Sequence, residues 1–312
     1  MDWQYSTLLQ QIINGLSLGS VYALIAVGYS LVYSILSFSN FAHGGFLVVG
    51  AYVCYGIYNG FEASIFSYHF FTVPAIPNIW IAGTGGLIAA GIVAVITERM
   101  AYKPIRERTS MTLYLLIASM GAFIVIENFF VVFVSARFRA LPHDIFPISP
   151  FVLTQGVVVR GLDILSLVAA VVFLGGLQLF LTRTRWGLAI RAAACDLRTA
   201  GLMGVNTAFL IGIVFFVAGL LAAVGGIFLS LNYMLSPQMG GITIKAFIAA
   251  LIGGLGSLPG AVVGSLILGL AEMLTTGFIS SQMRDLVVYS MLIIMLLVKP
   301  SGLFGKQISD KI

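Results

Sequence analysis

Two carboxylates stand out because they lie inside long apolar runs of the sequence. Glu127 lies in the run 111–134, and Glu272 lies in the run 259–278. A carboxylate within a membrane is costly unless a partner or water satisfies it, so such groups mark ion pairs, proton relays or solute pathways. Lys245 begins a neighbouring apolar segment and can pair with Glu272 if the two segments adjoin as helices. A structural ion pair is one interpretation, and contact with the ammonium group of a solute is the other.

A second polar interruption is the stretch FSNFAHGG, residues 38–45, which separates two apolar runs. The Asn40 side chain can accept hydrogen bonds from backbone N–H groups that the first turn of a helix leaves free, so capping explains the polarity. The alternative is that Asn40, Phe41, His43 and Gly44 line a pathway or its cytoplasmic gate. The two interpretations are compatible, because a cap at a break between helices can also be a gate.

The sequence shows no constellation typical of an enzyme or of a cofactor site. The three histidines do not lie at ligand spacing, so we expect no metal site and no cofactor. We also expect no catalytic residues, since no nucleophile and base lie at a plausible spacing. The phosphate-binding pattern GxxxxGK[ST] does not occur, and GLFGKQ at 302–307 lacks its spacing and hydroxyl. If ATP drives this protein, the ATPase is therefore another polypeptide.

These residues must be positioned by membrane helices, because 60% of the 312 residues are hydrophobic and only 9% are charged. We predict an all-α polytopic membrane protein with about eight or nine spans, forming a single transmembrane domain over residues 1–312. The predicted spans are 12–33, 41–59, 79–98, 111–134, 163–181, 208–231, 244–258, 259–278 and 283–298. Because 244–258 is short, it is either a full span or a re-entrant segment. A further helix in 60–78, or a wrongly placed end of the chain, are two other ways to settle the count.

Lysine and arginine predict the orientation, because they are retained in cytoplasmic loops. Placing the loops 99–110 and 182–207 and the C-terminal tail inside puts 11 of the 16 basic residues on the cytoplasmic side. The net charge of +5 follows from this retention, so we expect no nucleic-acid partner. FSNFAHGG then lies inside and the N-terminus outside.

The 35 glycines predict close helix packing, since small residues let helices approach each other in a membrane. Gly15 and Gly19 show the small-xxx-small spacing in the first span, and Gly256, Gly260 and Gly264 repeat it near the end of the chain.

The stretch 182–207 predicts one short amphipathic helix outside the bilayer, ending at Gly201 and Gly204. The residues predicted to share one face of it are Arg191, Cys195 and Arg198. It either holds two spans in register as an interfacial helix or docks onto a cytoplasmic partner.

Four segments carry a resemblance to a known family. LSFSNFAHGGFLVVGAY, TERMAYKPIR, RAAACDLRTAGLMGVNT and KAFIAALIGGLGSLPGAVVGSLILGLAE resemble, in this order, the permeases of ABC importers for branched-chain amino acids. The resemblance implies a multi-pass subunit in the bacterial inner membrane, within the lipid bilayer. It also implies three kinds of partner: a second and different permease chain, two ATP-binding subunits, and an external or periplasmic substrate-binding protein.

The resemblance also implies a coupling helix that seats in the ATPase. The residues that match it are Arg191, Asp196, Leu197, Ala200, Gly201 and Gly204. The competing hypothesis is a secondary transporter or channel that acts alone on small polar solutes, with proton binding at Glu127 or Glu272 supplying the energy. The substrate itself does not follow from the sequence, because an external binding protein would select it.

Overall fold

The structure is a computed structural model, and it describes residues 2–65, 68–109, 111–142, 145, 150–154 and 156–305. Within these ranges, seven helical segments are long and apolar enough to cross a membrane. The helices that form them are α1 (Asp2–Leu36), α3 (Ile79–Thr97), α5 (Thr112–Phe133), α6 (Gly161–Arg183), α9 (Thr207–Asn232), α11 (Leu258–Phe278) and α12 (Arg284–Val298). The prediction of an all-α polytopic membrane protein is confirmed.

Two of the predicted spans are shorter helices, α2 (His43–Asn59) and α10 (Thr243–Gly253). At about 1.5 Å per residue, the 11 residues of α10 extend about 16 Å, which is roughly half of the hydrocarbon thickness. The segment therefore cannot cross the bilayer by itself as a helix, which agrees with the re-entrant alternative for 244–258.

The strands are short and lie in two hairpins. β1 (Phe61–Ile65) pairs with β2 (Tyr68–Val73), and β3 (Phe151–Thr154) pairs with β4 (Val157–Val159), both antiparallel. The described part of 60–78 thus contains a β-hairpin, so the alternative of a further helix there is wrong.

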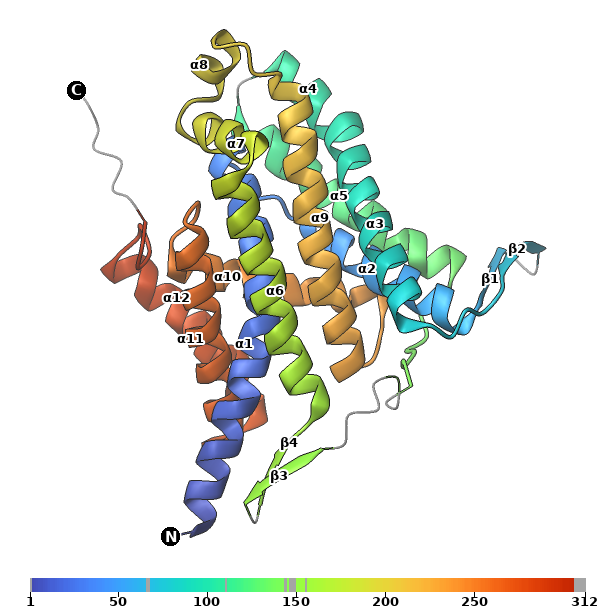
Figure 1. The fold of residues 1–312 in the computed structure, drawn as a ribbon, viewed down its shortest axis with the longest axis vertical. Helices are drawn as coiled ribbons and strands as arrows, with labels where there is room; N and C mark the ends of the chain where they lie inside the picture. The colour runs from blue at the N-terminus through green and yellow to red at the C-terminus, as the bar shows by residue number, and fades with distance from the viewer. Residues whose placement is uncertain are drawn as a thin grey trace. The chain divides into compact units, whose positions relative to one another are not determined.

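The chain, whose helices and strands are labelled in Figure 1, divides into two compact units that are each assembled from separated stretches of sequence. Unit 1 contains residues 1–34, 146–176 and 244–312, and unit 2 contains residues 35–145 and 177–243. The proposal of a single permease domain rests on the sequence alone.

In unit 1, helices α1 and α11 approach each other through glycines. A Cβ atom added to Gly15 would lie 2.9 Å from the Cα of Leu270, and one added to Gly269 would lie 2.5 Å from the backbone nitrogen of Gly19. The close packing predicted for Gly15 and Gly19 is therefore present.

The second glycine repeat is packed differently from the prediction. Gly260 and Gly264 lie in α11 and face the backbone of α10 at Gly253 and Ala249. Gly256, however, precedes α11 with a φ of +85°, in the left-handed region that glycine adopts without strain. It makes the turn between α10 and α11, so it does not belong to the helical repeat.

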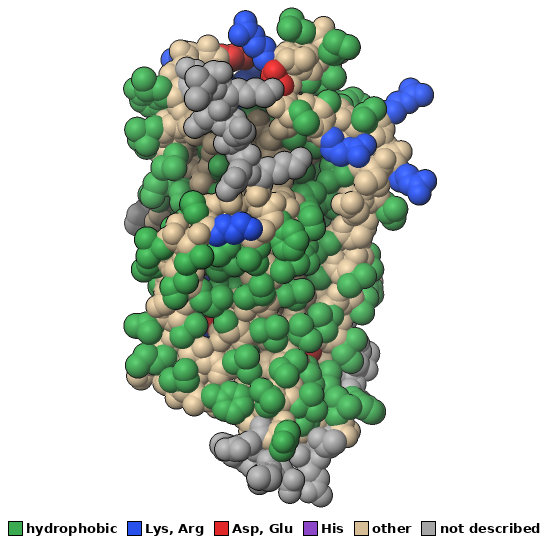
Figure 2. Space-filling model, turned by 90° about the vertical axis from the view of Figure 1, so that its left-hand side faces the viewer, with side chains coloured by type: hydrophobic (Ala, Val, Ile, Leu, Met, Phe, Trp, Pro, Cys, Tyr) green, Lys and Arg blue, Asp and Glu red, His purple; other side chains and the backbone are tan. Residues whose placement is uncertain are grey.

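In unit 2, helices α2, α3 and α9 pack against one another and form the core. Gly50 of α2 lies against Ala223 of α9, while a Cβ on Gly219 would lie 2.7 Å from the carbonyl oxygen of Ala90 in α3. Small residues at these crossings bury α2 almost completely. The face of the molecule in Figure 2 is covered over its middle by hydrophobic side chains, as a surface in contact with lipid requires.

Candidate solute pathway and coupling region

The polar stretch FSNFAHGG, residues 38–45, lies where α1 connects to α2. The sequence predicts that this connection is on the cytoplasmic side. Asn40 is buried, and its Oδ1 accepts hydrogen bonds from the Tyr102 hydroxyl at 2.7 Å and from the Ala42 N–H at 3.2 Å. The Asn40 side chain thus accepts a hydrogen bond from a backbone N–H, as predicted. This N–H belongs to Ala42, which directly precedes the first residue of α2, His43. The Asn40 amide nitrogen has no hydrogen-bond partner among the described residues.

The neighbours of Asn40 fix the same connection to other elements of unit 2. The Phe41 N–H donates to Ser119 Oγ of α5 at 3.2 Å, and the buried His43 ring packs edge-on against Phe46 with 6.2 Å between centroids. A Cβ on Gly44 would lie 2.7 Å from the Gly240 carbonyl oxygen in the 3₁₀-helix η2 (Pro237–Ile242). The structure therefore brings Asn40, Phe41, His43 and Gly44 together at one buried junction.

Sequence reasoning missed Tyr102, Glu98 and Arg106 at this end of unit 2. Tyr102 ends the π-helix η1 (Glu98–Tyr102), which α4 (Lys103–Arg108) follows directly. Glu98 is buried and accepts a hydrogen bond from Arg106 Nη2 at 2.9 Å, whereas Arg106 Nη1 is buried without a partner among the described residues. The signal was Glu98 at the end of an apolar run with basic residues following it, a stretch that served only for the orientation and for the family resemblance.

The predicted pair of Lys245 and Glu272 is present in unit 1. Glu272 is 1% exposed, and its Oε1 lies 2.7 Å from Lys245 Nζ and 3.3 Å from Arg284 Nε. Its Oε2 accepts a hydrogen bond from the Tyr22 hydroxyl at 2.9 Å. Lys245 also lies 2.7 Å from Asp285 Oδ1, so two cations and two carboxylates compensate one another. We call these five residues the Glu272 cluster.

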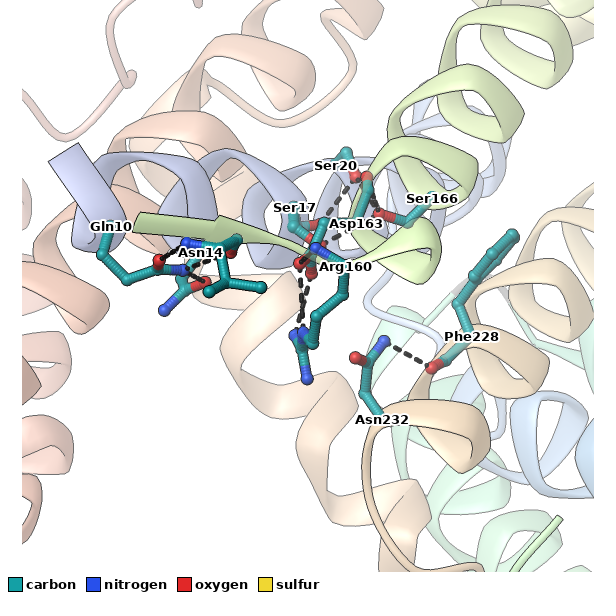
Figure 3. A network of polar contacts seen from close by, with 10 residues as sticks. Gln10, Asn14, Ser17, Ser20, Arg160, Asp163, Ser166, Phe228 and Asn232 are labelled. Carbon is teal, nitrogen blue, oxygen red and sulfur yellow. Dashed lines mark hydrogen bonds and ion pairs between the residues drawn. The ribbon is translucent and has the colours of Figure 1, made fainter. Parts of the chain in front are cut away.

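A second polar group of unit 1 lies where α6 begins (Figure 3). The buried Asp163 carboxylate accepts from the Arg160 guanidinium at 2.8 Å and 3.0 Å. One turn further along α6, Ser166 Oγ lies 3.0 Å from Ser17 Oγ of α1. These bonds fix the beginning of α6 against α1 within the unit.

Glu127 behaves differently from Glu272. It lies in α5 of unit 2 and is partly exposed, and its carboxylate makes no hydrogen bond or ion pair with any residue that the structure describes. A role of either glutamate in solute binding remains a prediction.

The single helix predicted over 182–207 is wrong, because two helices occupy this stretch. They are α7 (Arg185–Cys195) and α8 (Leu197–Leu202), separated at Asp196, whose backbone is extended. Arg198 consequently does not share a helical face with Arg191 and Cys195. The physical reason is that Asp196 caps a new helix instead of continuing the first.

Hydrogen bonds around Asp196 stabilise this break. Its Oδ1 accepts from the N–H groups of Arg198 at 2.8 Å and Thr199 at 3.1 Å, and its Oδ2 accepts from the Thr199 hydroxyl at 2.5 Å. The pKa of the Asp196 carboxyl is lower than its usual value. The hydrogen bond from the Thr199 side chain is the largest cause, and the hydrogen bonds from the Thr199 and Arg198 backbone are the next.

The other residues predicted to couple to an ATPase lie on both sides of this pair of helices. Arg191, Gly201 and Gly204 are exposed, Leu197 is partly exposed, and Ala200 is buried. Helix α8 ends at Leu202, and Gly204 follows with a φ of +87°. Gly201 lies inside α8, where an added Cβ would meet only Thr207 Cγ2, at 3.5 Å. Gly204 rather than Gly201 therefore makes the exit from the helix.

Apolar helices long enough to cross a membrane, buried polar groups between them and a pair of short helices in a connecting loop define a polytopic membrane protein. Residues 11–296 match the family described as branched-chain amino acid transport system, permease component. The chain belongs to this family, and it is a multi-pass protein of the plasma membrane and a permease component of a transport system.

Permease proteins from three organisms are similar to this chain over most or all of its length. The chain is 35% identical over 328 residues to the high-affinity branched-chain amino acid transport system permease protein LivH of Salmonella typhimurium, with 100% of both chains covered. It is 35% identical to BraD of Pseudomonas aeruginosa, with 97% of this chain and 98% of BraD covered. A probable LivH of Methanocaldococcus jannaschii is 29% identical, with 90% and 88% covered.

Proposed function

We propose that this chain is a permease subunit of an ABC importer for branched-chain or other hydrophobic amino acids. It receives its substrate from an external binding protein, pairs with a second and different permease chain, and is driven by two separate ATP-binding subunits. The names of the full-length relatives support the substrate class.

The observation that carries the ATPase coupling is the exposed apolar face of α7 and α8. Gly187, Ile190 and Ala193 of α7 are buried. The side chains of Leu188, Leu202 and Met203 are exposed by 61%, 82% and 81%. Large apolar side chains next to charged residues in a loop favour a groove on another protein as their partner.

The contacts of α7 give this docking surface a route to the core of unit 2. The Trp186 ring packs on the Phe209 ring of α9 with 5.2 Å between centroids. At the start of α7, Thr184 Oγ1 accepts the Gly187 N–H at 2.9 Å and donates to the Phe180 carbonyl of α6 at 2.7 Å. A displacement of α7 by an ATPase would thus reach α9, which packs on α2 and α3.

Asn40, Phe41, His43 and Gly44 form what we call the Asn40 junction, and within this proposal it is the candidate gate. It contains no carboxylate, lysine or arginine, and the unpaired Asn40 amide nitrogen is a donor that a carboxylate or carbonyl oxygen of a solute can accept from. The Glu272 cluster suits a structural role better, because both oxygens of the carboxylate already have partners. Contact between Glu272 and a solute ammonium group would require Lys245 or Arg284 to leave.

The first experiment measures uptake of labelled leucine into proteoliposomes that contain the permease pair, the binding protein and ATP, with and without the ATP-binding subunits. We expect uptake that requires these subunits and continues after the proton gradient is collapsed. Uptake that ignores the subunits and disappears with the gradient would instead make the chain a stand-alone transporter, with Glu127 and Glu272 as the residues to substitute.

The coupling surface is tested by Gly201→Trp, which adds an exposed ring to α8 at a position with room for a Cβ. We expect uptake and association with the ATP-binding subunits to fall by about tenfold or more, as for a disrupted interface centre. Gly121→Trp in α5 is the matched control, since nothing lies within 4 Å of an added Cβ there. Normal association and uptake in Gly201→Trp would remove the coupling assignment.

A further inference from the structure

Unit 2 contains an apolar groove that the proposed transport cycle does not use. It has a volume of about 570 Å³ and is lined by residues of three helices that Figure 1 labels, α2, α3 and α5. The lining residues include Val53 of α2, Ala89 and Val93 of α3, and Phe129 and Phe133 of α5. The lining is almost entirely apolar, so the groove suits a hydrocarbon chain and not a zwitterionic solute.

Two tyrosines of α2, Tyr52 and Tyr55, are among the residues that line the groove. Tyr52 lines the groove and is 4% exposed, and its hydroxyl is buried without a hydrogen-bond partner among the described residues. Tyr55, one turn further along α2, also lines the groove and lies under the Arg139 guanidinium, with 5.4 Å from Cζ to the ring centroid.

Arg139 is held at this position by its backbone and has donors to spare. Its N–H and carbonyl oxygen pair with Leu235 at 2.9 Å and 2.7 Å, and its Nη2 donates to the Val134 carbonyl at 3.0 Å. Of the five N–H donors of the guanidinium, only this one has a hydrogen-bond acceptor among the residues that the structure describes. Because Arg139 follows the apolar helix α5 by six residues, we expect it near the membrane headgroups at that end of the span.

We propose that this groove binds one acyl chain of an anionic phospholipid, with the lipid phosphate held by Arg139. The apolar walls accept the hydrocarbon, and the guanidinium pairs with the phosphate. An apolar groove with a cation beside one of its lining residues, Tyr55, matches an anionic amphiphile in polarity and charge. The proposal is independent of which solute the permease carries.

Native mass spectrometry of the complete transporter, delipidated in detergent, tests the headgroup. The probes are phosphatidylglycerol and phosphatidylcholine with identical acyl chains, and glycerophosphoglycerol as the headgroup without chains. We expect phosphatidylglycerol to be retained about fivefold over phosphatidylcholine, a ratio that corresponds to one basic residue at an anionic headgroup. Arg139→Gln should abolish the preference and Arg139→Lys should keep most of it, whereas Arg137→Gln, a control in the same loop, should leave it unchanged.

Ala89→Phe tests the acyl site, because the ring would fill the groove. Retention of both lipids should fall in this variant but not in Ile88→Phe, whose side chain is exposed outside the groove. Equal retention of the two lipids in the unsubstituted protein, or binding of glycerophosphoglycerol as tight as that of the lipid, would overturn the proposal.

A photoreactive phenylalanine derivative at position 89 identifies the occupant directly. The expected product in membranes is the chain plus the mass of one phospholipid. A product with the mass of two protein chains would show that a helix of another permease subunit fills the groove, and the lipid assignment would be wrong.

Discussion

The Asn40 junction of unit 2 and the Glu272 cluster of unit 1 both bury polar groups among apolar helices. Asn40 is held by a hydrogen bond from the Tyr102 hydroxyl, whereas Glu272 is held by ion pairs. The hydrogen bond from Tyr102 to Asn40 and the ion pair from Lys245 to Glu272 are both 2.7 Å long. Losing one neutral partner leaves a buried polar atom unsatisfied, at about 1–3 kcal/mol. Losing one charged partner leaves a buried charge uncompensated, at about 3–5 kcal/mol.

This difference suggests different tasks for the two regions. A junction that opens and closes during transport must break its contacts in every cycle, so neutral hydrogen bonds suit it better than ion pairs. The Glu272 cluster joins α10, α11, α12 and, through Tyr22, α1 in one unit, and each of its contacts is expensive to break. We therefore expect it to hold helices in place throughout the cycle.

The largest effect is expected from Lys245→Met, which leaves the buried Glu272 with Arg284 as its one remaining cation in the cluster. The free energy of unfolding should fall by about 3 kcal/mol, which thermal denaturation of the purified transporter would detect. Lys245→Met combined with Glu272→Leu should recover part of the loss, because the buried carboxylate is gone and the charges that remain, Arg284 and Asp285, are more exposed than Glu272. A Lys245→Met protein that is as stable as the wild type but fails in uptake would instead place Lys245 in the pathway.

Gly44→Ala should give the next effect, because its Cβ would lie 2.7 Å from both the Gly240 carbonyl oxygen and Thr243 Oγ1. Moving the backbone of η2 away should cost about 1–3 kcal/mol, as for other overpacked sites. Uptake and thermal stability should both drop, whereas Gly121→Ala, with open space around the new methyl group, should change neither. Unchanged uptake in Gly44→Ala would separate this contact from the gate.

Tyr102→Phe should have a smaller effect of about 1 kcal/mol on stability, since Asn40 Oδ1 keeps the Ala42 N–H as a donor. If the junction is the gate, the variant should also leak substrate in proteoliposomes without ATP. Tyr114→Phe is the control, as Tyr114 is exposed on α5. A tight, fully active Tyr102→Phe protein would argue against gating by this hydrogen bond.

The smallest effect is expected at Asp196. This carboxylate is exposed to solvent, whereas Glu272 is buried. Because its pKa is below the usual value in the folded protein, the stability it contributes is present above the unfolded pKa of about 3.9 and is lost as the pH falls through the folded pKa. The cap should therefore persist between pH 5 and pH 8.

Hydrogen exchange of the Arg198 and Thr199 amides, corrected for intrinsic rates, measures this cap. Asp196→Ala should speed exchange in α8 only, and Asp196→Asn should retain most of the protection because the amide oxygen still accepts. Equal protection in Asp196→Ala and the wild type would show that α8 does not depend on the cap.

The sequence predicted those parts of the molecule in which one residue type has few ways to be satisfied. Glu272 in an apolar run demanded a cation, and Lys245 was near enough to be proposed. Tyr102 escaped prediction because a tyrosine beside an apolar run is typical of a membrane interface, and only the fold places its hydroxyl on Asn40. The break at Asp196 was not predicted, because the alanine-rich run before it favours one helix that continues through Asp196. A capping aspartate is only a weak local signal against this.

The contact between Gly19 and Gly269 has a consequence for how this protein can change over generations. With an added Cβ on Gly269 only 2.5 Å from the Gly19 nitrogen, the two backbones touch and no side chain separates them. A partner substitution elsewhere cannot create room, because there is no neighbouring side chain to shorten. Drift at this crossing is therefore blocked one step at a time, and only a concerted shift of both helices would open it.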